Sequence, residues 1–242
     1  MRGEDDGSRR IATIGEVHFT GAIDGEGCSI CRHVRTNQER WIWQVLYEFS
    51  SDRTLRSELN RSFGLCPPHA RLLVAVVEER ELVDGVSVAH IYESIVHTYL
   101  EGCQAANGSS RRAARSLEGL EGEDCPLCAY QRGVEERTVS VLLKSLESNA
   151  GVARYRSSDG LCNAHLRRCA QEAERPDVRR LLLDDHIERL ERLAATLGEL
   201  LRKQRYDVDE DVTPEEAASW REVIWRFAGM AYDRPLVRRR LR

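Results

Sequence analysis

The sequence lacks most features that mark membrane, exported or nucleic-acid-binding proteins. No run of about eighteen consecutive apolar residues occurs, which excludes an ordinary transmembrane helix. Residues 1–20 lack the continuous apolar stretch of a secretory signal, so we expect no export and a cytoplasmic location. Lysine is almost absent, with Lys144 and Lys203 the only two, and the formal net charge is −4. The overall charge therefore gives no indication of binding to nucleic acids or membranes, and we expect a protein as the partner.

A recognisable catalytic constellation is also missing, because the chain has no phosphate-binding loop and no nucleophile paired with a base. What the chain does have is the composition of a soluble protein, with 41% hydrophobic residues, together with eight cysteines. In a reducing compartment such cysteines are more typical of metal ligands than of disulfides. Their spacing is therefore the most informative feature of the sequence.

Six cysteines and two histidines form two copies of one pattern, which indicates an internal duplication. A Cys-x-x-Cys pair is followed by a long interval and then by a Cys-x-x-His pair, which Gly-Leu precedes in both copies. In the first copy the interval is 34 residues, and the four residues are Cys28, Cys31, Cys66 and His69. In the second copy the interval is 33 residues, and the four residues are Cys125, Cys128, Cys162 and His165.

These spacings suit a tetrahedral metal site. Two cysteines three positions apart at a turn or helix start can aim both sulfur atoms at one point, and a second pair completes the site. A Cys-x-x-His pair at a helix start places both ligands on one side of the first turn. The positive end of the helix dipole there favours thiolates. We therefore predict two metal ions per chain, with structural zinc preferred and iron–sulfur clusters as the alternative.

The sequence leaves open which pairs meet, although local closure is feasible. A helix of about twenty residues carries the chain about 30 Å away, and a short second helix with its loops can bring it back. We therefore expect each copy to close its own site, with ligation that crosses between the copies as the alternative.

Four further residues have roles that the pattern does not decide. A shift of 96 residues superposes His90 on His186, which makes both candidates for groups that support the ligands. Cys103 and Cys169 have no cysteine counterparts. Leu73 stands opposite Cys169, so we expect Cys169 in the apolar core, with a reserve thiolate in oxidation as the alternative.

Helical periodicity predicts an all-α fold of two tandem pseudo-repeats of about four helices each, followed by a C-terminal helix. In the first copy we expect helices over 31–49, 53–61, from 67 onward, and over 86–102, and in the second copy the last helix spans 177–202. The final helix begins at a capping box of Thr213 and Glu216. The predicted organisation is a disordered segment (1–20), a first metal-binding repeat (21–103), a linker (104–123), a second metal-binding repeat (124–205), and an acidic linker, Trp-rich helix and basic tail (206–242).

The motifs resemble those of uncharacterised bacterial helical proteins in which Cys-Pro-x-Cys precedes Gly-x-Cys-x-x-His. Cys125-Pro126-Leu127-Cys128 matches that pattern fully, whereas Cys28-Ser29-Ile30-Cys31 lacks the proline. The resemblance covers residues 28–100 and 125–201. It implies the metal ligands and carries no activity.

The preferred functional hypothesis is a non-enzymatic adaptor or regulatory protein whose zinc sites rigidify helical surfaces for a protein partner. The Trp-rich C-terminal helix is the expected docking element. One alternative is a redox protein, either an iron–sulfur electron carrier or a zinc–thiolate sensor that loses its metal on oxidation. Another is a zinc-dependent enzyme. The oligomeric state is left open by the sequence.

Overall fold

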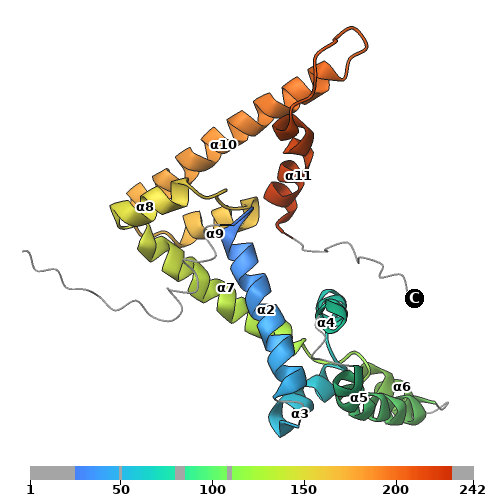
Figure 1. The fold of residues 1–242 in the computed structure, drawn as a ribbon. Helices are drawn as coiled ribbons and strands as arrows, with labels where there is room; N and C mark the ends of the chain where they lie inside the picture. Colours follow the sequence, from blue (N-terminus) through green and yellow to red (C-terminus); the bar gives the residue numbers. More distant parts are fainter. Residues whose placement is uncertain (1–24, 49–50, 80–84, 108–110, 231–242) are drawn as a thin grey trace, which may run out of the picture. The chain divides into compact units, whose positions relative to one another are not determined.

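A computed structural model describes residues 25–48, 51–79, 85–107 and 111–230 of the chain. Within these ranges the regular structure is entirely helical, which confirms the all-α prediction (Figure 1). None of the described helices is long and apolar enough to cross a membrane. The predicted disordered segment and the arginine-rich end of the chain lie outside the described residues. The helices are α2 (Ser29–Tyr47), α3 (Arg53–Arg61), α4 (Pro67–Glu79), α5 (Gly85–Ala106), α6 (Arg111–Glu118), α7 (Pro126–Ser145), α8 (Asn149–Arg156), α9 (Asn163–Glu172), α10 (Pro176–Lys203) and α11 (Pro214–Ala228).

Four helices follow one another in the same order in each half, α2 to α5 and then α7 to α10. Local signals in the sequence set several of their ends. Asp52 caps α3 by accepting a hydrogen bond from the Leu55 amide. The predicted capping box at the start of α11 is confirmed, since the Thr213 and Glu216 side chains each bond the other's backbone amide. The expected end of the first helix at Phe49 lies outside the described residues.

The segment predicted as a linker, residues 104–123, is more helical than expected. Helix α5 continues to Ala106, and residues Arg111–Glu118 form the separate helix α6. Alanine, arginine, leucine and glutamate in this segment are strong helix formers. Helix α6 packs against α5, and the Leu120 side chain beyond it lies against Gly102. The correction therefore comes from helix propensity together with packing.

The chain forms two compact units that do not follow the two copies. Unit 2 is Val34–Glu136. Unit 1 combines the described residues up to His33 with those from Arg137 to Met230. Helix α2 therefore begins in unit 1 and continues in unit 2, whereas α7 begins in unit 2 and ends in unit 1. Each unit thus contains helices from both copies.

In unit 2 the core forms where α3 packs on α5, and where α2, α4 and the start of α7 add apolar side chains. The rings of Trp41 on α2 and Tyr130 on α7 lie 6.3 Å apart, which places these two helices in contact. The buried apolar residues of this core include Ile42, Leu46, Leu59, Leu72, Ile91, Ile95 and Leu127. This core surrounds the starts of α4 and α7.

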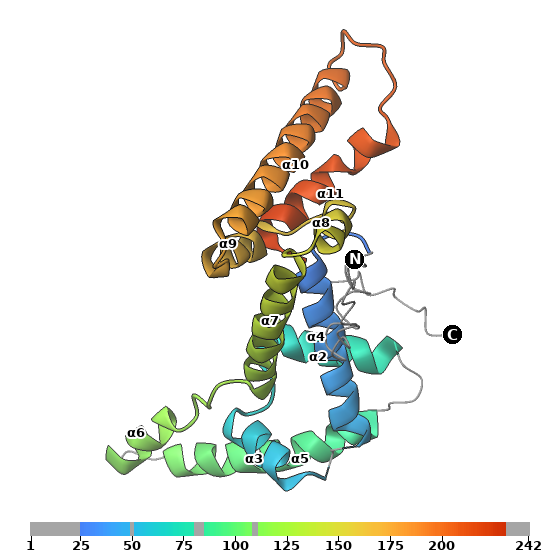
Figure 2. The same ribbon diagram turned by 90° about the vertical axis from the view of Figure 1, so that its left-hand side faces the viewer.

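In unit 1 helix α10 packs against α9 and α11, and α11 also contacts α9 (Figures 1 and 2). Cys169 is fully buried in this core, as predicted from its apolar counterpart in the first copy. The other fully buried side chains include Ile30, Val139, Leu142, Tyr155, Leu161 and Leu182. This core surrounds the starts of α2 and α9.

Candidate metal centres

All four ligand pairs lie at helix starts. The first residue of each pair immediately precedes a helix, and the second lies in its first turn. The backbone carbonyl of the first residue in each pair accepts a hydrogen bond from an amide inside the helix, so the pair lies directly at the helix end. These four carbonyls belong to Cys28, Cys66, Cys125 and Cys162. The first turn of a helix has free amide hydrogens and a positive dipole end. Each pair therefore lies where thiolates are favoured.

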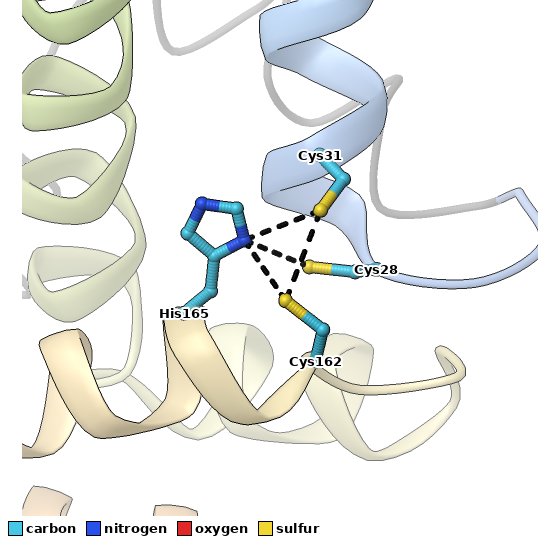
Figure 3. Close-up of side chains that lie close together, drawn as sticks. All are labelled: Cys28, Cys31, Cys162 and His165. Carbon is cyan, nitrogen blue, oxygen red and sulfur yellow. Dashed lines mark hydrogen bonds between the residues drawn. The ribbon is translucent and has the colours of Figure 1, made fainter. Parts of the chain in front are cut away.

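The starts of α2 and α9 meet in unit 1 to form centre A, which consists of Cys28, Cys31, Cys162 and His165. Its four ligand atoms all lie within 4.8 Å of one another. The Nδ1 atom of His165 lies 3.4 Å from Cys28 Sγ, 3.3 Å from Cys31 Sγ and 3.2 Å from Cys162 Sγ. Figure 3 shows this ring nitrogen facing the three sulfur atoms. Cys28 and Cys162 are buried, and Cys31 is partly exposed.

The starts of α4 and α7 meet in unit 2 to form centre B, which consists of Cys66, His69, Cys125 and Cys128. Its ligand atoms also lie within 4.8 Å of one another. The Nδ1 atom of His69 lies 3.2 Å from Cys66 Sγ, 3.5 Å from Cys125 Sγ and 3.4 Å from Cys128 Sγ. Both centres therefore offer three sulfur atoms and one Nδ1 nitrogen.

The expectation that each copy closes its own site is wrong, and the crossed alternative is the observed arrangement. Each centre joins the Cys-x-x-Cys pair of one copy to the Cys-x-x-His pair of the other. Helix α2 has 19 residues and carries the chain about 28 Å from centre A at 1.5 Å per residue. The segment that follows, which includes the nine-residue α3, leads to the start of α4 in unit 2. The next ligand pair, Cys66 and His69, therefore meets the start of α7.

The glycine that precedes each Cys-x-x-His pair has a structural reason. Gly64 and Gly160 have φ angles of +93° and +80°, in the region that favours glycine over other residues. A Cβ atom on Gly64 would also lie 2.8 Å from the Tyr92 ring. These glycines turn the chain into the ligand-bearing helix in both copies, which explains the shared Gly-Leu before the second pair.

The spacing of the ligand atoms fits one tetrahedral ion. Bonds of about 2.3 Å to sulfur place two sulfur ligands about 3.8 Å apart, and a shorter bond of about 2.0 Å to nitrogen gives a nitrogen–sulfur separation of about 3.5 Å. The Cys31 and Cys162 sulfur atoms lie 3.8 Å apart, and those of Cys66 and Cys128 lie 3.6 Å apart. The nitrogen–sulfur distances of 3.2 to 3.5 Å agree as well. Both centres can therefore hold one metal ion each.

The electrostatics of the clusters require metal to displace protons. Burial and a hydrogen bond with Cys66 raise the pKa of Cys128 to about 12. Hydrogen bonding to Cys162 and Cys28 raises the pKa of Cys31, whereas bonds from Cys28 and Cys31 lower the pKa of Cys162. Without metal, the thiols of Cys128 and Cys31 therefore keep their protons at neutral pH. Because metal binds the thiolate, the affinity of both centres falls as the solution is acidified.

Two glutamines orient the histidine of centre B. The Nε2 atom of His69 lies 3.1 Å from Gln131 Oε1 and 2.9 Å from Gln38 Nε2, and Gln38 Nε2 donates to the Gln131 oxygen at 2.8 Å. Of these two neighbours, the Gln131 oxygen is the one that can accept a proton from Nε2. Burial lowers the pKa of His69, which favours the neutral ring. A proton on Nε2 that is donated to the Gln131 oxygen leaves Nδ1 free to bind metal. The sequence pattern misses both glutamines, because the copies differ here: Val34 holds the place of Gln131 in the first copy.

We expect Gln131→Leu to weaken zinc binding at centre B by about 10–100-fold, the usual effect of removing a group that orients a metal ligand. Competition with a chromogenic zinc chelator measures the two affinities. Gln131→Glu keeps an acceptor oxygen at this position and should restore much of the affinity. Equal weakening of both centres, or of neither, would contradict this role for Gln131.

The other four residues fall into different environments. His186 is buried on α10, and its Nε2 lies 3.0 Å from the Asn163 side chain, beside the ligand Cys162. It therefore contacts the first residue of α9, next to the ligand Cys162. His90 is exposed on α5 and has no such place. Cys103 lies on α5 outside both centres. The match of His90 to His186 thus carries no shared role.

Searches of protein-family models, curated proteins and solved structures found no match to this chain.

Proposed function

We propose that the protein binds two structural zinc ions, one at each centre. The observation that carries the proposal is the pair of Cys₃His clusters, whose ligand atoms are spaced like the corners of a tetrahedron around one ion. Four filled ligand positions are typical of structural zinc. Ligands of an iron–sulfur cluster would be held further apart, because several iron and sulfide atoms lie between them. The ligand spacing therefore favours a single ion.

Metal analysis of the anaerobically purified chain tests this proposal. We expect two zinc ions per chain in a colourless protein, and removal of both by a strong chelator should unfold the two units. Apparent free energies of about 10–16 kcal/mol per structural zinc site equal the whole stability of many domains. A brown protein that contains iron and sulfide would sink the proposal.

We further propose that this zinc-stabilised scaffold is a non-enzymatic adaptor that presents α11 to a protein partner. The helix packs through its polar side: Glu216 pairs with Lys203 on α10 at 2.9 Å, and Ser219 and Arg226 are buried. Its apolar side remains exposed, with exposed fractions of 49% for Trp220, 55% for Ile224 and 61% for Phe227. A helix that buries polar residues and exposes apolar ones is typical of an interaction surface.

The stripe of Trp220, Ile224 and Phe227 fits an apolar groove in a partner protein. Its spacing of four and then three residues is the anchor pattern of helix-in-groove recognition. Whole aromatic side chains bury about 150–250 Å² each, so the two half-exposed aromatic side chains of the stripe together with Ile224 offer only roughly 300 Å². Two copies paired through this stripe alone would bury well under the about 1,600 Å² of a standard interface. A groove also covers the sides of the helix and so gains more area.

The charged residues near the stripe indicate which charges the rim of the partner's groove should carry. Asp209, Asp211 and Glu215 are exposed at the N-terminal end of α11, whereas the Arg221 guanidinium lies 4.8 Å from the centre of the Trp220 ring. A partner with basic residues around the end of the groove that receives Trp220 would complement these carboxylates. We therefore assign to the partner an apolar groove that has a basic rim at one end.

Replacing Trp220, Ile224 and Phe227 together by serine should abolish binding to that partner and leave both zinc ions in place. Exposed positions usually change stability by no more than about 0.5 kcal/mol each. The matched control is Leu183→Ser with Ile187→Ser, two exposed apolar residues of α10 in the same unit. Affinity purification from the source cells compares the three proteins. A partner that binds all three equally would disprove the assignment to α11.

A further inference from the structure

The C-terminal end of α11 lies directly on centre A. A Cβ atom built on Gly229 would lie 3.8 Å from Cys31 Sγ and 3.9 Å from Cys162 Sγ. Gly229 ends the helix, and its amide donates to the Trp225 carbonyl. A side chain at position 229 would therefore be in van der Waals contact with two ligand sulfur atoms.

The conformation of Gly229 is one that other residues rarely adopt. Its φ and ψ angles are +79° and +169°, a combination confined almost entirely to glycine. This turn directs the chain from α11 over centre A. Met230 follows and packs on Gly27, the residue before Cys28, where an added Cβ would lie 2.4 Å from the methionine sulfur. The end of α11 thus lies beside both segments that carry the ligands of centre A.

A buried arginine makes a second connection between α11 and centre A. Arg226 has an exposed fraction of 1% and pairs with Glu222 on the same helix. Its guanidinium donates to the Asp159 carbonyl at 3.3 Å. The Asp159 carboxylate in turn accepts the Gly27 amide at 2.6 Å. This chain of bonds joins α11 to the backbone beside Cys28, and it forms only when α2 and α9 have met.

No glycine among the described residues lies against the sulfur atoms of centre B as Gly229 does at centre A. Of the described glycines, Gly229 is the one whose added Cβ would lie near ligand sulfur atoms, and the glycine that precedes Cys66 packs instead on Tyr92. Helix α11 belongs to unit 1, as does centre A. The duplicated ligand sets have therefore acquired different neighbours.

We infer that zinc at centre A controls the display of α11, so that the docking stripe is a metal-dependent surface. This inference rests on the proposed function of both the zinc centres and α11. With metal bound, the starts of α2 and α9 form the surface against which Gly229 and Met230 pack, and α11 is held with its apolar side exposed. Without that metal, α2 and α9 separate and the end of α11 loses its contacts. Centre B stabilises unit 2 and leaves α11 unaffected.

Hydrogen exchange of the full chain tests the dependence on centre A. Cys31→Ser and Cys128→Ser remove corresponding, partly exposed cysteines from centres A and B. We expect exchange in residues 214–228 to accelerate by at least about tenfold in Cys31→Ser and to stay unchanged in Cys128→Ser. Equal acceleration in both variants, or none in either, would overturn the inference. The parent protein could contain two zinc ions while exchange in α11 is the same in Cys31→Ser as in the parent. That result would refute the control of α11 by centre A and leave the zinc proposal intact.

A second variant keeps every ligand and so remains informative if Cys31→Ser unfolds unit 1. Coupling between two sites is reciprocal, so loosening α11 must also weaken metal binding at centre A. Gly229→Ala forces alanine into a glycine-only conformation, and we expect it to speed zinc release from centre A to a chelator by about tenfold. Release from centre B should not change, and the two cysteine variants assign the two phases. Gly198→Ala on α10 is the control, because nothing lies within 4 Å of the added methyl group. Unchanged release from centre A in Gly229→Ala would contradict the coupling.

Discussion

A chain cut between the two copies is expected to stay in one piece until its zinc is removed. A protease recognition sequence in place of residues 108–110, which lie outside the described residues, would allow the purified protein to be cut. One fragment then carries the first copy's ligands and the other carries the second copy's. Because each centre takes two ligands from each fragment, a metal ion bound at either centre would join the fragments. Structural zinc sites contribute about 10–16 kcal/mol each, so two such links would hold the fragments together strongly.

Size-exclusion chromatography of the cut protein measures this effect. The fragments should elute together with zinc bound and separate after treatment with a strong chelator. A cut variant with both Cys66→Ser and Cys162→Ser lacks one ligand at each centre, and it should separate even with zinc in the buffer. If the cut fragments of the parent protein separate while each keeps one zinc ion, the ligands close within each copy. If the fragments remain together after chelation, helix packing rather than metal joins them.

The elements that the sequence predicts well are those with local causes. The start of α11 has its capping box of Thr213 and Glu216, and α3 has its cap at Asp52, so both could be predicted from neighbouring residues of the sequence. The ligand pairs are likewise local, because three-residue spacing at a helix start brings both side chains to one side. Their identity as zinc ligands remains a prediction that the geometry supports.

The pairing of the ligand sets has no local cause. The 34 and 33 residues between the pairs permit either closure within a copy or closure between copies, and the choice depends on the direction in which α2 and α7 leave their centres. Those directions follow from packing such as that of Trp41 on Tyr130, residues 89 positions apart in the sequence (130 − 41 = 89). The contact of Gly229 with centre A is equally non-local. Spacing alone therefore predicts the ligands and leaves their partners undetermined.

Pairs of ligand substitutions distinguish crossed from local ligation by metal content alone. Cys28 and Cys66 belong to one copy and to different centres, whereas Cys28 and Cys162 belong to different copies and to one centre. Losing a thiolate removes a ligand of a four-coordinate site and should abolish tight zinc binding there. We therefore expect Cys28→Ser with Cys66→Ser to lose both ions, and Cys28→Ser with Cys162→Ser to lose only one.

If each copy closed its own site, the first protein would lose only one ion and the second would lose both. The two variants are therefore compared with each other, and the conclusion does not require either to be as stable as the parent. The protein with both cysteines of centre A replaced should keep a folded unit 2, since all four ligands of centre B remain. Metal analysis after removal of loosely bound zinc gives the stoichiometry, and hydrogen exchange shows which unit keeps its protection. Retention of one ion by the first protein and loss of both by the second would refute the crossed arrangement. Neither copy need be a stable domain by itself, because each unit and each ligand set combines segments from both copies.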